Sequence, residues 1–334
     1  HTDVEPELLR TLEEHATDLA RQAGTLLLSY FGNPLEVQYK SQRWSDPVTE
    51  ADHAAENLIV EGIQSRFPDH GIITEETPND QWKDKEFVWI IDPLDGTTNF
   101  VNRYPLFGSS IGVLRHGIPI VGAMFLPSPL TSVGQVFHAR TGGGAYVDEH
   151  KVALSPTLAL SPTRLSALPS HFSGQFNIKP NLRQNLGETR TTGSIVFELS
   201  LVASGALQLA AFSAPKIWDV AAGLLILQEA GGHAYIRNQS REWAPFHSFE
   251  DQGAGLPTDG DLQKWGASLV VGNGDVATVM GTSTIPRPQL GRFYTKMHSW
   301  IRSKATAQND ENLETDKQGD QSSPESDSRV LPPR

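Results

Sequence analysis

The segment at residues 92–100, which reads DPLDGTTNF, has the residue types and spacing best suited to chemistry. An apolar run at residues 87–91 precedes it and predicts a buried strand. Asp92 and Asp95 follow that strand, so a turn of the chain can bring both carboxylates to one spot. Pro93 fixes φ there, and Gly96 lets the backbone approach closely. A helix that begins after Gly96 would point free N–H groups at the same spot, which suits phosphate. A plain acidic turn is the alternative interpretation.

Three further acidic positions accompany predicted element ends. Glu75 and Glu76 follow a short apolar run at residues 71–73, and Asp219 begins an apolar helix that is almost free of charge. Asp52 lies on a predicted helix, where it could hydrogen-bond the hydroxyl of Thr97 and orient an attacking water. Each position has an ordinary alternative. The glutamates could be a solvated surface, Asp219 could only complement the helix dipole, and Asp52 could be exposed.

The carboxylates of Glu75, Asp92, Asp95 and Asp219, with the carbonyl of Leu94, form a candidate donor set made only of oxygen atoms. Such a set selects Mg²⁺ or Mn²⁺ over zinc. Without a cation, four converging carboxylates would repel one another and their pKa values would rise. Two bound cations would offset that repulsion, activate a water and stabilise a leaving oxygen. The chain offers no serine-nucleophile elbow and no Ca²⁺-binding DxDxDG loop.

Composition narrows the possible functions. The chain has 334 residues, no cysteine and a formal net charge of −12. The negative charge disfavours a nucleic-acid-binding role. The lack of cysteine excludes disulfides, thiolate zinc sites and cysteine nucleophiles. We find neither a leader pattern of basic then apolar residues nor a run of eighteen apolar residues. We therefore expect a cytoplasmic protein that is not bound to a membrane.

Hydrophobic periodicity predicts the elements that position these residues. Helices are predicted at residues 5–31, 49–67, 176–186, 194–204 and 217–230. Strands are predicted at residues 71–73, 87–91, 110–114, 118–125, 133–138 and 268–271, with a mobile loop at 40–47 and a tight turn at 142–144. We predict an N-terminal α+β subdomain at residues 1–155 that carries the metal site, a C-terminal α/β subdomain at 156–302 that completes it, and a disordered acidic tail at 303–334.

The motifs DPLDGTTNF at 92–100 and WDVAAGLLILQEAGG at 218–232 resemble those of the inositol monophosphatase family of Mg²⁺-dependent, lithium-sensitive phosphatases. Weaker matches are SDPVTEAD at 45–52 and TEET at 74–77, and the resemblance extends over about residues 7–280. It implies a mixed α/β fold, the αβαβα layered sandwich shared with fructose-1,6-bisphosphatase, commonly as a homodimer. It also implies a phosphoric monoester hydrolase that uses two or three Mg²⁺ ions, or Mn²⁺, on a small phosphorylated metabolite.

The resemblance also assigns roles to residues. The metal ligands would be Glu75, Asp92, Asp95, Asp219 and the carbonyl of Leu94. Asp52 and Thr97 would orient the attacking water, Glu75 would also lie near a third metal, and Lys40 would sit on a loop that closes over the site. Phosphate and substrate would contact Asp95, Gly96, Thr97, Ser194, Ile195, Phe212 and Asp219.

Two positions depart from the inositol-specific pattern. Phe212 stands where an acidic residue usually holds substrate hydroxyls, and Ile195 stands where a small residue is common. A pocket with these residues should offer fewer acceptors to a polyol. Inositol monophosphate is the first expectation. Histidinol phosphate, fructose 1,6-bisphosphate and 3′-phosphoadenosine 5′-phosphate are alternatives, as is a non-catalytic binding protein on the same fold.

Overall fold

The computed structural model describes residues 4–34, 37–39, 47–128, 131–155, 159–169, 176–178, 180–238, 242–251, 260–274 and 284–286. All of them belong to one compact unit that ends at Pro286. The predicted loop at 40–47, including Lys40, lies almost wholly outside these residues, and so does the predicted tail at 303–334. The predicted subdomain boundary near residue 155 remains a prediction.

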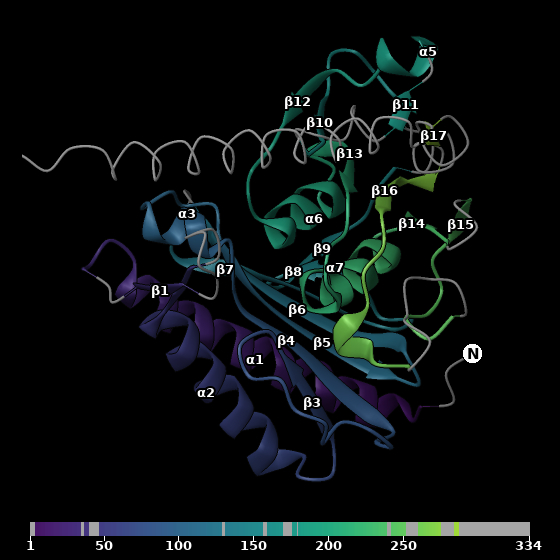
Figure 1. Cartoon of the computed structure of the whole chain (residues 1–334). Helices are drawn as coiled ribbons and strands as arrows, with labels where there is room; N and C mark the ends of the chain where they lie inside the picture. Colours follow the sequence, from purple (N-terminus) through teal and green to yellow (C-terminus); the bar gives the residue numbers. More distant parts are fainter. Residues whose placement is uncertain are drawn as a thin grey trace, which may run out of the picture. The chain divides into compact units, whose positions relative to one another are not determined.

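A seven-stranded sheet forms the first half of the unit (Figure 1). Its strands, in spatial order, are β3 (Gly71–Thr74), β4 (Phe87–Asp95), β5 (Gly108–Arg115), β6 (Ile118–Ser128), β7 (Thr131–Arg140), β8 (Gly144–Val147) and β9 (His150–Val152). β3 runs parallel to β4, and the other neighbours are antiparallel. The central strands are apolar along most of their length because helices cover both faces.

Helices α1 (Pro6–Tyr30) and α2 (Glu50–Arg66) cover one face of this sheet (Figure 1). The apolar side of α1 repeats at helical spacing, and its buried residues include Leu12, Leu19 and Leu27. They pack against Trp89, Ile111, Phe125 and other residues of the sheet. α2 begins with a capping box, in which Thr49 and Asp52 satisfy each other's backbone N–H groups.

Helices α6 (Ile195–Ala203) and α7 (Ile217–Glu229) cover the other face. α7 lies unusually close to the sheet because two glycines face it. A Cβ atom on Gly122 would lie 2.5 Å from the carbonyl oxygen of Ala222, and one on Gly112 would lie 3.0 Å from the Cβ of Ala221. The first distance is too short for a real side chain and the second is tight, so α7 could not pack at this depth with a larger residue at position 122.

A six-stranded sheet lies beyond α6 and α7. Its strands, in spatial order, are β12 (Glu188–Arg190), β10 (Leu165–Ala167), β13 (Leu207–Phe212), β16 (Leu269–Asn273), β14 (Gly232–Arg237) and β15 (Trp243–Pro245). Leu186 follows the short helix α5 (Pro180–Arg183) and packs with Leu209 and Val270 on the outer face of this sheet. The alternation of helical and sheet layers confirms the predicted layered α/β fold.

The remaining described elements are short. They are β1 (Val37–Tyr39), β2 (Pro47–Thr49), α3 (Thr97–Val101), β11 (Phe176–Ile178), η1 (Leu262–Lys264) and β17 (Thr284–Pro286). β1 pairs with β2, so the two strands flank residues 40–46.

One predicted helix is wrong. Residues 176–178 form strand β11, which pairs with β17, and only Pro180–Arg183 is helical in that region. The residue before a proline is disfavoured in helical conformation, so Pro180 separates the two pieces. Strands β10 and β12 to β15 were not predicted. Among the described helices, none is both long and apolar enough to cross a bilayer.

Candidate active site

The carboxyl end of β4 supplies two of the predicted ligands. Asp92 and Asp95 are three residues apart, so a regular strand would point their side chains to opposite faces. The pairing of β4 with β5 shifts register between these two residues, and this irregularity lets both side chains turn to one side. Both are buried, with 1% and 8% of their surface exposed.

Asp219 supplies the third carboxylate from the first turn of α7. Its Oδ2 accepts a hydrogen bond of 2.7 Å from the backbone N–H of Lys216, so it caps the helix as the simpler interpretation requires. It also lies beside the strand end. Asp92, Asp95 and Asp219 each offer an oxygen within 4.8 Å of the others. The structure therefore brings together three predicted ligands from two distant segments.

The electrostatics of this cluster are unfavourable for bare carboxylates. Burial raises the pKa of Asp92 well above its usual value, and the charges of Glu75, Asp95 and Asp219 raise it further. Burial raises the pKa of Asp219 to about 8, with Asp95 and Glu75 adding to the effect. Burial also raises the pKa of Asp95 to about 6, even though hydrogen bonds oppose the shift.

Glu75 lies just outside this group of three. It follows β3, and its backbone N–H donates 3.2 Å to the carbonyl of Ile91 in β4. Its charge contributes to the raised pKa of all three aspartates, which places its carboxylate near them. Glu75 also lines a neighbouring cavity with Trp218.

Asp52 and Thr97 form the predicted pair. The Oγ1 of Thr97 lies 3.2 Å from Oδ1 of Asp52 and 3.0 Å from the carbonyl oxygen of Leu94, so its proton can be donated to either. The other oxygen of Asp52 accepts from the backbone N–H and the hydroxyl of Thr49. Asp52 is only 1% exposed, which excludes the alternative of a solvated side chain. Burial raises its pKa, although these hydrogen bonds oppose the shift.

The start of α6 fixes Asp95. Ser194, the N-cap residue of α6, donates its hydroxyl to Oδ2 of Asp95, and the backbone N–H of Val196 donates to the same oxygen at 3.0 Å. A Cβ on the adjacent Gly96 would lie 3.3 Å from that of Ser194, and Gly96 has φ +85°, so this close turn requires glycine. The hydroxyl of Ser194 is therefore committed to Asp95.

A cavity of about 410 Å³ opens beside Asp219. Ser194, Ile195 and Phe212, three predicted pocket residues, line it with Asp219. Glu198 and Ser213 also line it, and the sequence analysis identified neither. Burial raises the pKa of Glu198, and two hydrogen bonds from Thr192 lower it in part. The position of Glu198, one helical turn after Ser194, is a signal that could have found it.

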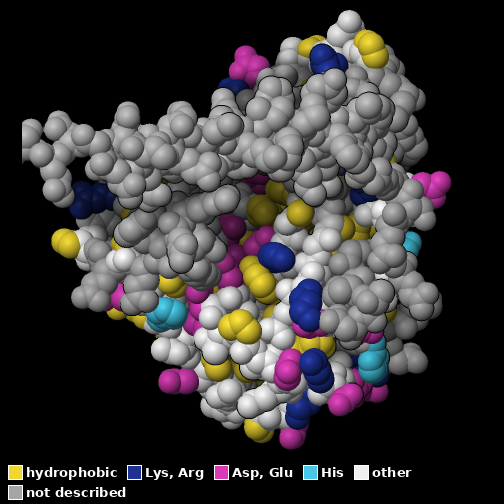
Figure 2. All heavy atoms as spheres, in the orientation of Figure 1, with side chains coloured by type: hydrophobic (Ala, Val, Ile, Leu, Met, Phe, Trp, Pro, Cys, Tyr) yellow, Lys and Arg dark blue, Asp and Glu magenta, His cyan; other side chains and the backbone are white. Residues whose placement is uncertain are grey.

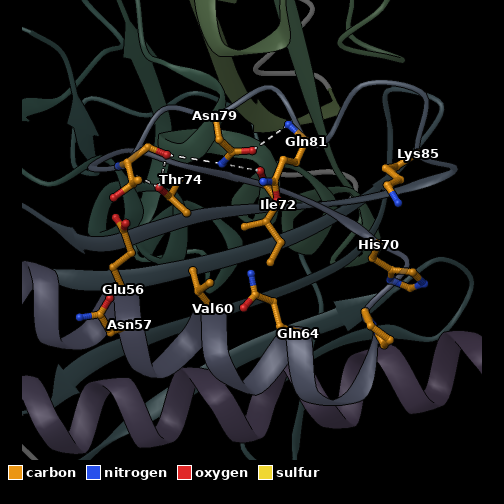
Figure 3. A pocket seen from close by; sticks show the side chains of 12 residues that line it. Glu56, Asn57, Val60, Gln64, His70, Ile72, Thr74, Asn79, Gln81 and Lys85 are labelled. Carbon is orange, nitrogen blue, oxygen red and sulfur yellow. Dashed lines mark hydrogen bonds between the residues drawn. The ribbon is translucent and has the colours of Figure 1, made fainter.

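A second cavity, of about 510 Å³, lies between α2 and the edge strand β3 (Figure 3). Glu56, Gln64, His70 and Lys85 are among its lining residues, and none of the three clustered aspartates reaches it. The chemistry therefore does not belong to this larger cavity. In the space-filling view, acidic side chains gather near the middle of the visible face, where the surface is hollowed (Figure 2).

The donor set fits a hard divalent cation. All its atoms are oxygens, and among the described residues neither His nor Cys joins the cluster. The raised pKa values of the three aspartates indicate that the described residues do not neutralise their charge. A site of this kind holds Mg²⁺ or Mn²⁺ in preference to zinc.

Comparison with known proteins decides the family. Residues 8–266 match the profile of the inositol monophosphatase family. The chain belongs to this family.

Similar proteins agree in fold and sequence. The chain is 36% identical over 236 residues to an inositol-1-monophosphatase of Synechocystis, covering 68% of this chain and 79% of that protein. It is 35% identical over 222 residues to the Nus factor SuhB of Pasteurella multocida, covering 64% and 80%. The solved structure of a Thermotoga maritima inositol monophosphatase is 25% identical, covers 81% of this chain and 96% of its own, and superposes with a TM-score of 0.63.

Membership of the inositol monophosphatase family supports phosphatase activity and a divalent metal, in agreement with the acidic cluster. It also supports a small phosphorylated ligand. The relatives carry both enzyme and Nus-factor names, so membership by itself assigns neither a substrate nor a role.

Proposed function

We propose that this protein is a Mg²⁺-dependent phosphatase that hydrolyses a small phosphate monoester, with inositol monophosphate as the first candidate substrate. The observation that carries the proposal is the convergence of Asp92, Asp95 and Asp219, of which the first two are buried and the third is partly buried. A solvated acidic patch needs no such burial, whereas a cation-binding site does. Two or three Mg²⁺ ions, or Mn²⁺, would be held by these residues with Glu75 and the carbonyl of Leu94.

A bound divalent cation supplies charge that neutralises the phosphoryl oxygens during transfer to water. The residues of the chain do the rest. The Thr97 hydroxyl is hydrogen-bonded to Asp52 and is placed to orient a water. As the water attacks, its proton would pass through this hydroxyl to the carboxylate of Asp52. The raised pKa of Asp52 makes it a better proton acceptor than a solvated aspartate. Backbone N–H groups of Gly96 and Thr97 would contact the phosphate.

The close partner of Asp95 sets the geometry of the site. Ser194 and the N–H of Val196 hold one oxygen of Asp95 and leave the other for a cation or the substrate. Ile195, Phe212 and Asp219 would then surround the leaving group. Lithium inhibition, a homodimer and a cytoplasmic location are further parts of the proposal.

Phosphate release over a panel of monoesters tests the proposal. The panel holds inositol phosphates, histidinol phosphate, fructose 1,6-bisphosphate, 3′-phosphoadenosine 5′-phosphate and p-nitrophenyl phosphate. Each is assayed with Mg²⁺, with Mn²⁺, with EDTA and with added Li⁺. We expect metal-dependent release, strongest with inositol monophosphate and inhibited by Li⁺. Release from none of the esters would contradict the proposal.

The names of the SuhB relatives motivate a second candidate, a binding protein on the same fold. The intact cluster favours catalysis over binding alone. The two differ in how they depend on the site, because turnover requires the aspartates whereas binding through another surface does not.

A further inference from the structure

The cavity beside Asp219 is lined by one further charged side chain, Glu198, that has no role in the proposed chemistry. Glu198 lies on α6, one turn after Ser194, and is 7% exposed. Its Oε1 accepts both the backbone N–H and the hydroxyl of Thr192, each at 2.9 Å. Its Oε2 accepts no hydrogen bond from the described part of the chain.

A second polar atom of this cavity also lacks a partner. The side-chain oxygen of Ser213 is buried, and no hydrogen bond satisfies it within the described residues. Ser213 follows Phe212 at the end of β13 and lines the same cavity as Glu198. Unsatisfied buried polar groups are costly, and a ligand that hydrogen-bonds them would remove that cost.

The rest of the lining is mainly apolar. Ile195, Phe212 and Pro215 contribute side chains without hydrogen-bonding groups. Phe212 is 5% exposed, so its ring is part of the wall. Apart from Ser194, whose hydroxyl bonds Asp95, the polar side chains of this lining away from the acidic cluster are Glu198, Ser213 and Thr191. The Thr191 hydroxyl already donates to the carbonyl of Leu168. Phe212 and Ile195 were expected to leave the pocket with fewer acceptors for a polyol, and the carboxylate of Glu198 on α6 is one acceptor that this expectation did not include.

We propose that Glu198 selects the substrate, because its Oε2 accepts a hydrogen bond from a donor on the leaving group of a phosphate monoester. The preferred leaving group carries hydroxyl or amino donors and no second phosphate. A carboxylate gains from a nearby hydrogen-bond donor and repels a further anion. The inference rests on the proposed phosphatase activity and narrows its substrate class to polyol or amino-alcohol monophosphates, and away from bisphosphates.

The sharpest variant is Glu198→Gln. The amide oxygen can still accept from Thr192, so the loop before α6 keeps its anchor. The other terminal atom changes from an acceptor to a donor and loses its charge. Thr192→Val is the complementary variant, because it leaves Glu198 in place and removes the Thr192 hydroxyl, which bonds Glu198 and also accepts from the backbone N–H of Ser194. Glu188→Gln, on the exposed strand β12, is the matched control for the charge change.

The experiment measures kcat and KM for four substrates. Inositol monophosphate and histidinol phosphate carry hydroxyl and amino donors. p-Nitrophenyl phosphate carries no donor on its leaving group, and 3′-phosphoadenosine 5′-phosphate carries a second phosphate. For Glu198→Gln we expect the ratio of kcat/KM for a donor-bearing substrate to that for p-nitrophenyl phosphate to fall about tenfold or more, through KM. The relative rate on the bisphosphate should rise.

The outcomes separate the possibilities. A fall with inositol monophosphate identifies a polyol, and a fall with histidinol phosphate alone identifies an amino alcohol. Both support the role of Glu198. If Glu198→Gln and Thr192→Val lower kcat equally for all four substrates, Glu198 only anchors the loop and the inference is wrong. If wild-type protein hydrolyses only p-nitrophenyl phosphate, the phosphatase proposal stands and this inference fails. Hydrolysis of none of the four rejects both.

Discussion

Glu13 and the aspartate cluster at the end of β4 both place carboxylates away from water, but only Glu13 has cationic partners among the described residues. Glu13 on α1 is 5% exposed, and it contacts His138 at 2.7 Å and the guanidinium of Arg140. Burial alone would raise the pKa of Glu13, but these hydrogen bonds and positive charges lower it. Burial lowers the pKa of His138, but the hydrogen bonds to Glu13 and to the carbonyl of Asp148 outweigh it and the pKa is raised.

Among the described residues, no arginine or histidine pairs with the cluster of Asp92, Asp95 and Asp219. Asp92 and Asp95 are buried, Asp219 is partly buried, and the pKa of each is raised. The difference shows that the fold can neutralise a buried carboxylate where the role is structural. At the end of β4 the described residues leave the charge of the aspartates without a cationic partner. That contrast is the physical argument for a cation at this site.

Removing a cluster carboxylate should give the largest effect. Asp95→Asn and Asp219→Asn should each lower turnover by about two orders of magnitude or more, because each loses a charged ligand. Phosphate release and circular dichroism measure activity and folding together. Asp69→Asn, an exposed acid before β3, is the control and should keep wild-type turnover. Near-normal turnover in the Asp95 variant would remove it from the site.

The stability of the metal-free protein should depend on pH in a way that the cluster sets. The pKa of these aspartates is higher in the folded protein than in the unfolded chain, so the folded protein binds protons more tightly. The resulting stabilisation is complete below about pH 4, the pKa of an aspartate in the unfolded chain. It is lost as pH rises through the pKa values of the folded protein. With Asp95 at about 6 and Asp219 at about 8, the melting temperature in EDTA should fall between pH 4 and 8. Added Mg²⁺ should flatten the slope. An equal slope in Asp219→Asn would contradict this origin.

Removing the charge of Glu13 should lower the stability of the fold without changing phosphatase turnover. Glu13→Gln leaves His138 and Arg140 without their carboxylate, and we expect a loss of about 2 kcal/mol in the free energy of unfolding. The typical cost of breaking a buried pair is larger, but the two cationic side chains are 18% and 30% exposed. Urea denaturation measures the loss. It should be the same with and without Mg²⁺, since the two sites are separate.

The Ser194 hydroxyl offers the smallest and most local test. Ser194→Ala removes one hydrogen bond to Asp95 but leaves the backbone N–H of Val196 in place. We expect about tenfold lower turnover and about 1 kcal/mol lower stability. Ser200→Ala, on the same helix, removes a hydroxyl that bonds only within α6 and serves as the control. Equal losses in the two variants would mean that Asp95 does not depend on Ser194.

The local sequence predicted the parts of the site that lie close together in the chain. DPLDGTTNF revealed Asp92, Asp95 and Thr97 because the strand, the turn and the carboxylates occupy nine consecutive residues. The helices α1, α2, α6 and α7 followed from their apolar spacing. The convergence of Asp219 on this segment is a contact between distant parts of the chain, and it was predicted from the residue types and then from the family resemblance.

Other features had no local signal. The three-residue strands β10 and β12 are too short for periodicity to show. The 176–186 region has apolar residues at helical spacing, yet Pro180 and the pairing with β17 prevent one helix. The position of Glu198 one helical turn after Ser194 could be read from the sequence, but its cavity could not, because that cavity forms only when β13 and α6 meet.

The two glycines beneath α7 have a consequence for metal choice. Asp92 is carried by the sheet and Asp219 by the helix, so the gap between them is fixed by how deeply α7 seats on Gly112 and Gly122. A methyl group at Gly122 would push α7 away from the sheet and widen the gap. Mg²⁺ requires shorter bonds to its ligands than Ca²⁺ does. The two glycines would therefore favour the smaller ion, although neither of them would touch it.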